Sequence, residues 1–106
     1  MLLRDRFWLW GHPEGAFNNA AGNTKVSRMT PAECCAYLGI SKTFMVPMDH
    51  VVNRRQYNKS FKGLKAVGWE CFKAGKDPSL IEPYFEEARE FPNISCVVFD
   101  DFKNDE

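Results

Sequence analysis

The stretch Asn93-Ile94-Ser95-Cys96-Val97-Val98-Phe99-Asp100-Asp101-Phe102 decides the fold of this chain. Its apolar part, from Ile94 to Phe99, is rich in β-branched residues and does not alternate cleanly between apolar and polar positions. This pattern is typical of a strand covered on both faces, as in a parallel sheet. Ligands of parallel α/β sheets bind beyond the carboxyl ends of the strands. The carboxylates of Asp100 and Asp101, which follow directly, are therefore the first candidate site residues.

The rest of the chain alternates between extended and helical patterns. A capping box of Thr30 and Glu33, with Pro31 at the first helical position, predicts a helix that Gly39 ends. Aromatic and β-branched runs predict strands, and apolar residues at helical spacing predict further helices. The expected elements are a strand at residues 6–12, a helix at 31–38, a strand at 43–48, helices at 60–74 and 81–91, and a last strand at 94–99.

Strands that alternate with helices predict right-handed βαβ crossovers and a parallel sheet in an α/β fold. Polar segments follow the three strands: His12 with a long loop at residues 13–28, the segment 49–55, and Asp100 with Asp101. In a parallel sheet these segments share one rim, and a long loop there is usually functional. Three parallel strands leave open edges, and a closed barrel needs about 250 residues. We therefore expect residues 1–106 to be one N-terminal segment of a (β/α) barrel, which is incomplete.

The bulk properties narrow the class of protein. The chain has 106 residues and no formal net charge at pH 7, which argues against a nucleic-acid or membrane-surface partner. Its four cysteines form no CxxC pair, neither histidine stands at metal-motif spacing, and no GxGxxG or P-loop motif occurs. We expect no disulfide, no metal and no cofactor, in a reduced, cytoplasmic protein. The first residues lack the apolar run of a signal peptide or a membrane span.

Four runs carry a resemblance to a known group of proteins: Phe7-Trp8-Leu9-Trp10-Gly11-His12, Ser27-Arg28-Met29-Thr30-Pro31-Ala32-Glu33, Ala36-Tyr37-Leu38-Gly39-Ile40 and Val97-Val98-Phe99-Asp100-Asp101-Phe102. Together they resemble the opening of uncharacterised bacterial (β/α)8-barrel proteins that are similar in outline to glycoside hydrolases. The resemblance covers essentially the whole chain but only about three of the eight strand–helix units. It implies a TIM-type barrel with its site at the carboxyl rim, and carbohydrate processing as the activity.

Asp100 and Asp101 are the catalytic residues expected for such an enzyme. Successive strand side chains face opposite sides, and Asp100 shares the parity of Ile94 and Cys96, so we expect Asp100 to point into the barrel mouth. Glycoside hydrolysis needs two carboxyl groups that flank the scissile bond, about 5–9.5 Å apart. Neighbours on one strand do not flank the bond, so the second carboxylate comes from another strand, with Asp49 as the local alternative. The plainer interpretation is that both aspartates only solvate or cap the strand end.

The expected substrate-binding residues are Trp10, His12, Asp49 and Arg54. If the side of the strand that Trp10 and His12 share faces inward, the indole stacks on a sugar and the imidazole donates a hydrogen bond. Otherwise Trp10 is a core residue and His12 caps the loop. Arg54 and Arg55 either bind an anion through charge-assisted hydrogen bonds or belong to a solvated basic surface.

We therefore expect a carbohydrate-processing, glycoside-hydrolase-like enzyme, inactive as an isolated 106-residue chain. Its partners are a carbohydrate or other small-molecule substrate and the remainder of the barrel, without nucleic acid or membrane. The alternative is a small, non-catalytic α/β binding module that forms a homodimer through its sheet edges.

Overall fold

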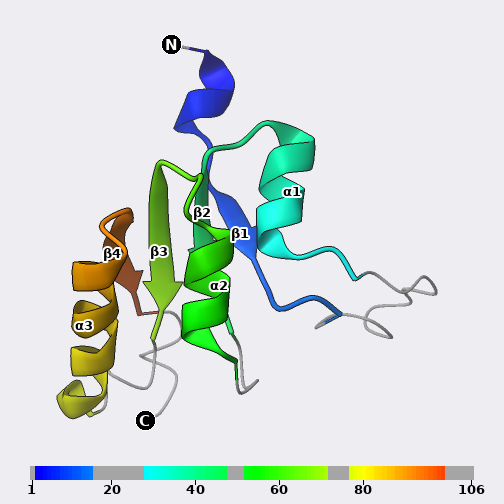
Figure 1. Ribbon diagram of the computed structural model, residues 1–106. Helices are drawn as coiled ribbons and strands as arrows, with labels where there is room; N and C mark the ends of the chain where they lie inside the picture. The colour runs from blue at the N-terminus through cyan, green and yellow to red at the C-terminus, as the bar shows by residue number, and fades with distance from the viewer. Residues whose placement is uncertain (1, 16–27, 48–51, 72–76, 100–106) are drawn as a thin grey trace, which may run out of the picture.

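The computed structural model describes residues 2–15, 28–47, 52–71 and 77–99. Helices and strands alternate along them (Figure 1). In chain order the elements are η1 (Leu3–Arg6), β1 (Leu9–Gly11), α1 (Pro31–Leu38), β2 (Lys42–Met45), α2 (Arg54–Ser60), β3 (Ala66–Glu70), η3 (Pro78–Ile81), α3 (Glu82–Glu90) and β4 (Ile94–Val98).

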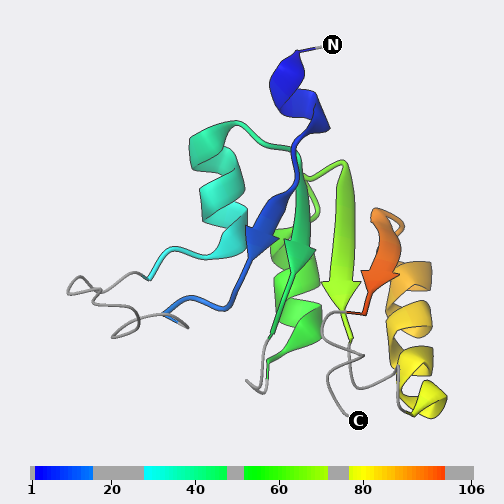
Figure 2. The ribbon, with the colours of Figure 1, turned by 180° about the vertical axis from the view of Figure 1, so that it is seen from behind.

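The strands form one parallel sheet in the order β1-β2-β3-β4, so each strand pairs with the next one along the chain. The predicted α/β class and the parallel strands are thereby confirmed. The α-helices lie on the same side of this sheet, and the view from behind presents the strands in front of them (Figure 2). The carboxyl ends of the strands meet at one rim, which lies at the bottom of Figure 1.

The core lies between the sheet and these helices. Its centre is formed by Met45, Phe61, Val67 and Trp69, none of which is more than 1% exposed. The helices contribute partly buried side chains to this one cluster, Ala32 from α1, Tyr57 from α2 and Tyr84 from α3. Because Met45 pairs with Trp69 in the register of β2 and β3, both side chains point to the helix side.

The opposite side of the sheet, called here the open face, carries the aromatic side chains of Trp8, Trp10 and Phe44. Trp8 stacks on Phe44 with ring centroids 4.4 Å apart, and Trp10 packs against it at 5.9 Å. Trp10 remains 47% exposed. In the part of the chain that the structure describes, no helix lies over this face (Figure 2).

The predicted helix at residues 60–74 is wrong. The structure has α2 at Arg54–Ser60 and the strand β3 at Ala66–Glu70 in its place. Val67 and Trp69 face the helix-side core while Gly68 between them lies beneath Phe44 on the open face, which is the alternation of a strand. Trp69 does not fit the helical spacing of the apolar residues in this segment, and in the structure it is 1% exposed and belongs to the core.

The other predicted elements are confirmed with shifted bounds. The helix at 31–38 begins with the expected capping box of Thr30 and Glu33 and ends at Gly39, whose φ is +71°. The strands predicted at 6–12, 43–48 and 94–99 are shorter, at Leu9–Gly11, Lys42–Met45 and Ile94–Val98. The last helix spans Glu82–Glu90 after a 3-10 turn.

Candidate functional site at the carboxyl rim

Asp49, Asp100 and Asp101 lie outside the described residues, so the roles expected for them stay predictions. The strand before them, β4, is described and contains an irregularity. Val67 pairs with Ile94 while Gly68 pairs with Cys96, so Ser95 is an additional residue in a β-bulge. Ile94 therefore packs against the helix-side core, whereas Cys96 points to the open face. The expected common parity of Ile94 and Cys96 is wrong.

Trp10 and His12 lie at the carboxyl end of β1. The Val46 amide donates to the Gly11 carbonyl at 2.7 Å, which ties this end of β1 to the residue that follows β2. Burial lowers the pKa of His12, while a hydrogen bond with the Val46 backbone acts in the opposite direction. The lowered pKa favours the neutral imidazole, which has one donor and one acceptor nitrogen, and the Val46 backbone engages the ring.

Glu70 is a rim carboxylate that the sequence analysis missed, because the helix predicted over 60–74 concealed its strand. It is the last residue of β3 and is only 2% exposed. By strand alternation it faces the same side as Gly68, which is the open face. It pairs with Val98 in β4, two residues before Asp100 in the sequence.

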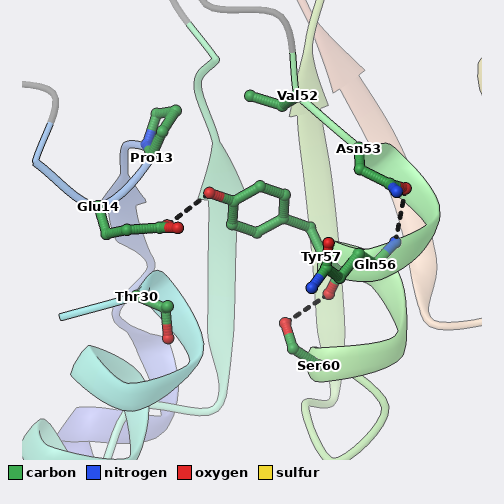
Figure 3. A pocket seen from close by; sticks show the side chains of 8 residues that line it. All are labelled: Pro13, Glu14, Thr30, Val52, Asn53, Gln56, Tyr57 and Ser60. Atoms are coloured by element: carbon green, nitrogen blue, oxygen red, sulfur yellow. Dashed lines mark hydrogen bonds between the residues drawn. The ribbon is translucent and has the colours of Figure 1, made fainter. Parts of the chain in front are cut away.

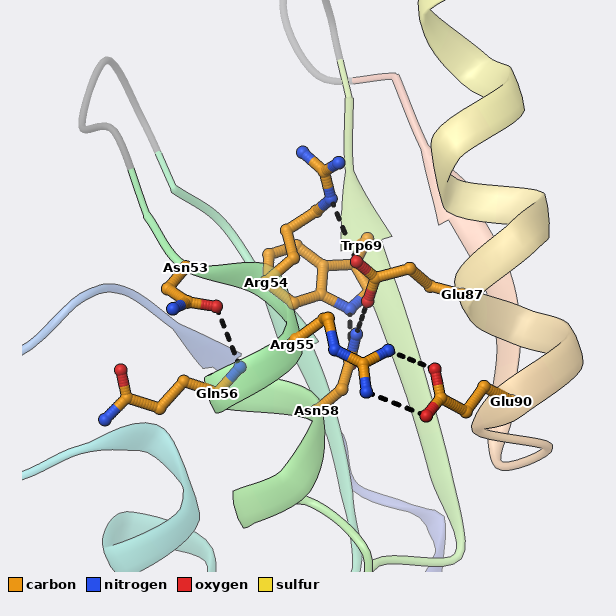
Figure 4. Close-up of polar contacts among 8 residues, drawn as sticks. All are labelled: Asn53, Arg54, Arg55, Gln56, Asn58, Trp69, Glu87 and Glu90. Carbon is orange, nitrogen blue, oxygen red and sulfur yellow. Dashed lines mark hydrogen bonds and ion pairs between the residues drawn. The ribbon is translucent and has the colours of Figure 1, made fainter.

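Arg54 and Arg55 are engaged by α3 (Figure 4). The Arg54 guanidinium lies over the Tyr84 ring at 4.9 Å, and its Nε is 3.7 Å from the Glu87 carboxylate. Arg55 forms a two-pronged hydrogen bond with Glu90, one prong of which measures 2.8 Å. These arginines join α2 to α3, and the structure does not bring Arg54 together with Trp10 and His12. A substrate-binding role for Arg54 stays a prediction.

A pocket of about 380 Å³, called here the rim pocket, opens between the starts of α1 and α2 (Figure 3). Its lining residues come from the segments after β1 and β2, from the N-cap of α1 and from α2: Pro13, Glu14, Thr30, Val52, Asn53, Gln56, Tyr57 and Ser60. Across it, the Tyr57 phenol donates to the Glu14 carboxylate at 2.6 Å. Burial, assisted by this carboxylate, raises the pKa of Tyr57 to about 12.

The loop at residues 13–28 was predicted to be functional, but neither Glu14 nor Tyr57 was predicted as a site residue. The two are 43 residues apart, and they meet because the segment after β1 lies beside α2. The one available signal was the length of the loop that follows β1.

Metal and thiol sites each require a particular arrangement of side chains. Within residues 2–15, 28–47, 52–71 and 77–99, no three His, Cys, Asp or Glu side chains converge as metal ligands would. The cysteines are free thiols, and burial raises the pKa of the Cys71 thiol to about 11, so it is protonated at neutral pH.

No helix in the described ranges combines the length and the apolar character needed to cross a membrane.

Comparison with protein families, curated proteins and solved structures finds no match to this chain.

Proposed function

We propose that this chain is part of a (β/α)-barrel enzyme that processes carbohydrates at the carboxyl rim of its sheet. The observation that carries the proposal is the sequential strand order β1-β2-β3-β4 with the helices on one side. Doubly wound sheets reverse their strand order and have helices on both faces, whereas barrels keep neighbouring strands sequential and their helices outside. In this proposal the open face is the interior of the barrel.

The carbohydrate part of the proposal is supported by the side chains at the end of β1. Trp10 presents a half-exposed indole on the open face, and the apolar surface of an aromatic ring suits the C–H faces of a sugar. Neutral His12 follows two residues later and can hydrogen-bond a sugar hydroxyl.

Carboxylates complete the proposed chemistry. Hydrolysis of a glycosidic bond uses one carboxylic acid and one carboxylate on opposite sides of the bond. Glu70 ends β3, and Asp100 and Asp101 follow β4, the neighbouring strand. In this proposal one carboxyl group comes from each of two adjacent strands, which neighbours on a single strand do not provide.

The carbohydrate site is tested by calorimetric titration of the chain with methyl glycosides of common sugars. Trp10→Ala is expected to lower the affinity by about tenfold, because a stacked aromatic contact contributes about 1 kcal/mol or more. Tyr37→Ala is the matched control, since Tyr37 is 80% exposed on α1, away from the rim. Equal affinities of the two variants contradict the site.

The barrel is tested on the encoding DNA. The proposal predicts that the reading frame continues beyond Glu106 with further strand and helix patterns, and a stop codon at that point contradicts it. The chain alone is expected to bind sugar without cleaving aryl glycosides.

A second function is favoured by the same open face. A non-catalytic binding module would cover the aromatic side chains of Trp8, Trp10 and Phe44, or pair the edge strands β1 and β4, with a second copy. Light scattering during gel filtration distinguishes this alternative, which predicts a monodisperse dimer that Trp10→Glu returns to a monomer.

A further inference from the structure

We propose that the rim pocket is a subsite for one sugar ring, an inference that rests on the carbohydrate function proposed above. Its volume of about 380 Å³ falls within the range of small-molecule pockets, about 300–1,000 Å³. It is built from the segments after two neighbouring strands, β1 and β2, where α/β sheets bind their ligands.

The lining of the rim pocket selects a neutral, polyhydroxylated ligand. Among the described residues that line it, Glu14 alone carries a charge. The other polar groups are hydroxyls and amides, which both donate and accept hydrogen bonds. Adjacent sugar hydroxyls match such a mixture, and a carboxylate without a cation among the described lining residues disfavours phosphate and other anions.

Tyr57 is held in place before any ligand arrives. Its ring packs against Phe61 and edge-on against buried Trp69, with ring centroids 6.2 Å and 6.5 Å apart. Its phenol donates a hydrogen bond of 2.6 Å to Glu14. This bond uses one acceptor position of a carboxylate that has several. A sugar hydroxyl can therefore donate to Glu14 while the Tyr57 bond persists, at little cost in side-chain ordering.

Other lining groups have fixed directions as well (Figure 3). The Asn53 side-chain oxygen accepts a hydrogen bond from the backbone N–H of Gln56 at 3.1 Å. This leaves the side-chain NH₂ of Asn53 as a donor. Ser60 donates to the Tyr57 carbonyl at 2.6 Å, which leaves its hydroxyl oxygen as an acceptor. The lining of the rim pocket thus offers donors and acceptors in addition to the carboxylate of Glu14.

The rim pocket continues the site proposed at Trp10. Pro13 and Glu14 follow His12 directly, so one short segment runs from the end of β1 into the lining of the pocket. Trp10 lies on the open face, whereas Tyr57 of the rim pocket packs on the helix side, so a sugar of more than one ring would cross the end of β1 to occupy both positions.

The test is a titration of isotope-labelled chain with methyl glycosides of mono- and disaccharides, followed by amide and side-chain NMR shifts. Binding is expected to shift the Gln56 side-chain amide and the backbone of Tyr57. Glu14→Ala is expected to weaken the affinity reported by these shifts about tenfold, as loss of a hydrogen bond to a charged group does. Glu86→Ala removes an exposed carboxylate from α3 and is expected to change nothing. Inorganic phosphate is expected to leave the pocket signals unmoved.

The outcomes separate this inference from the proposed function. Sugar-dependent shifts at Gln56 that Glu14→Ala weakens, and Glu86→Ala does not, support the subsite. Shifts confined to Trp10 leave the proposed function standing and overturn the subsite. No shift at either place overturns both, and a pocket that responds to phosphate rather than sugar overturns the ligand class. Tyr57→Phe keeps the ring and the fold, so a loss of affinity in this variant supports the phenol–carboxylate pair as a positioning element.

Discussion

The ring of Phe44 lies directly over the backbone of Gly68 on the open face of the sheet. A Cβ built at Gly68 would come within 2.5 Å of Phe44 Cδ1 and 2.8 Å of the Cys96 sulfur. Any other residue at this position would displace the ring on which Trp8 stacks. The glycine thus fixes the height of the aromatic side chains above the sheet, and with it the surface that Trp10 presents.

Gly68→Ala is expected to reduce the free energy of unfolding by about 1–3 kcal/mol, because the added methyl group overpacks the space beneath Phe44. The measurement is urea unfolding followed by circular dichroism. Gly63→Ala is the matched control, since a Cβ at Gly63 meets no atom within 4 Å. Equal stability of Gly68→Ala and Gly63→Ala would show that the Phe44 ring does not contact Gly68 closely.

Asn58→Ala is expected to destabilise the fold by about 1–3 kcal/mol, the cost of leaving a buried donor unsatisfied. Asn58 is 1% exposed, accepts from the Trp69 indole N–H at 2.9 Å and donates to Glu87 (Figure 4). Gln56→Ala, an exposed change on the same helix, is expected to stay within about 0.5 kcal/mol of the parent. Urea denaturation compares them, and a neutral Asn58→Ala would refute the buried link between α2 and β3.

The pH dependence of stability at alkaline pH is expected to report Tyr57. Its pKa rises from an ordinary 10.0 to about 12, because burial and the Glu14 carboxylate disfavour the phenolate. The folded state holds this proton more tightly, so the contribution to the free energy of unfolding is complete below pH 10 and is lost between pH 10 and 12. Tyr57→Phe removes this component from the pH profile.

Absorbance titration of the tyrosinate checks the same group directly. Subtracting the Tyr57→Phe curve is expected to isolate a transition near pH 12, and Glu14→Gln to lower its midpoint without restoring 10.0, since burial is the larger cause. A Tyr57 transition near pH 10 would contradict the buried pair.

The Arg55–Glu90 pair is expected to contribute little despite its two-pronged geometry. Both side chains are about half exposed, at 49% and 51%, and exposed pairs couple by about 0.2–1 kcal/mol. A double-mutant cycle with Arg55→Ala and Glu90→Ala measures this coupling, which added salt should reduce. A coupling well above that range, insensitive to salt, would indicate a pair shielded from solvent.

Local signals in the sequence predicted α1 correctly and β3 incorrectly. Thr30, Glu33 and Gly39 specify the start and the end of α1 through bonds within a few residues, which a sequence displays. Residues 61–72 carry apolar side chains that satisfy the helical period and the strand period alike. The strand is selected by distant contacts, namely Gly68 beneath Phe44 and the Trp69 indole on Asn58.

For the candidate site too, the features that depend on local pattern were predicted and those that depend on distant contacts were not. The position of Trp10 and His12 at a strand end follows from local pattern, and the structure places them there. Glu70 stayed hidden with its strand, and the Glu14–Tyr57 contact depends on the placement of the segment after β1 beside α2. The bulge at Ser95 inverted the expected side of Ile94, because one additional residue reverses strand parity.

The central claim, a carbohydrate site on the open face at the end of β1, is tested most directly by the indole N–H resonance of Trp10 during titration with methyl glycosides. The account predicts a saturable shift of this resonance, with the buried Trp69 indole unmoved as the internal reference. A Trp10 resonance that stays in place at every sugar concentration tested would contradict it.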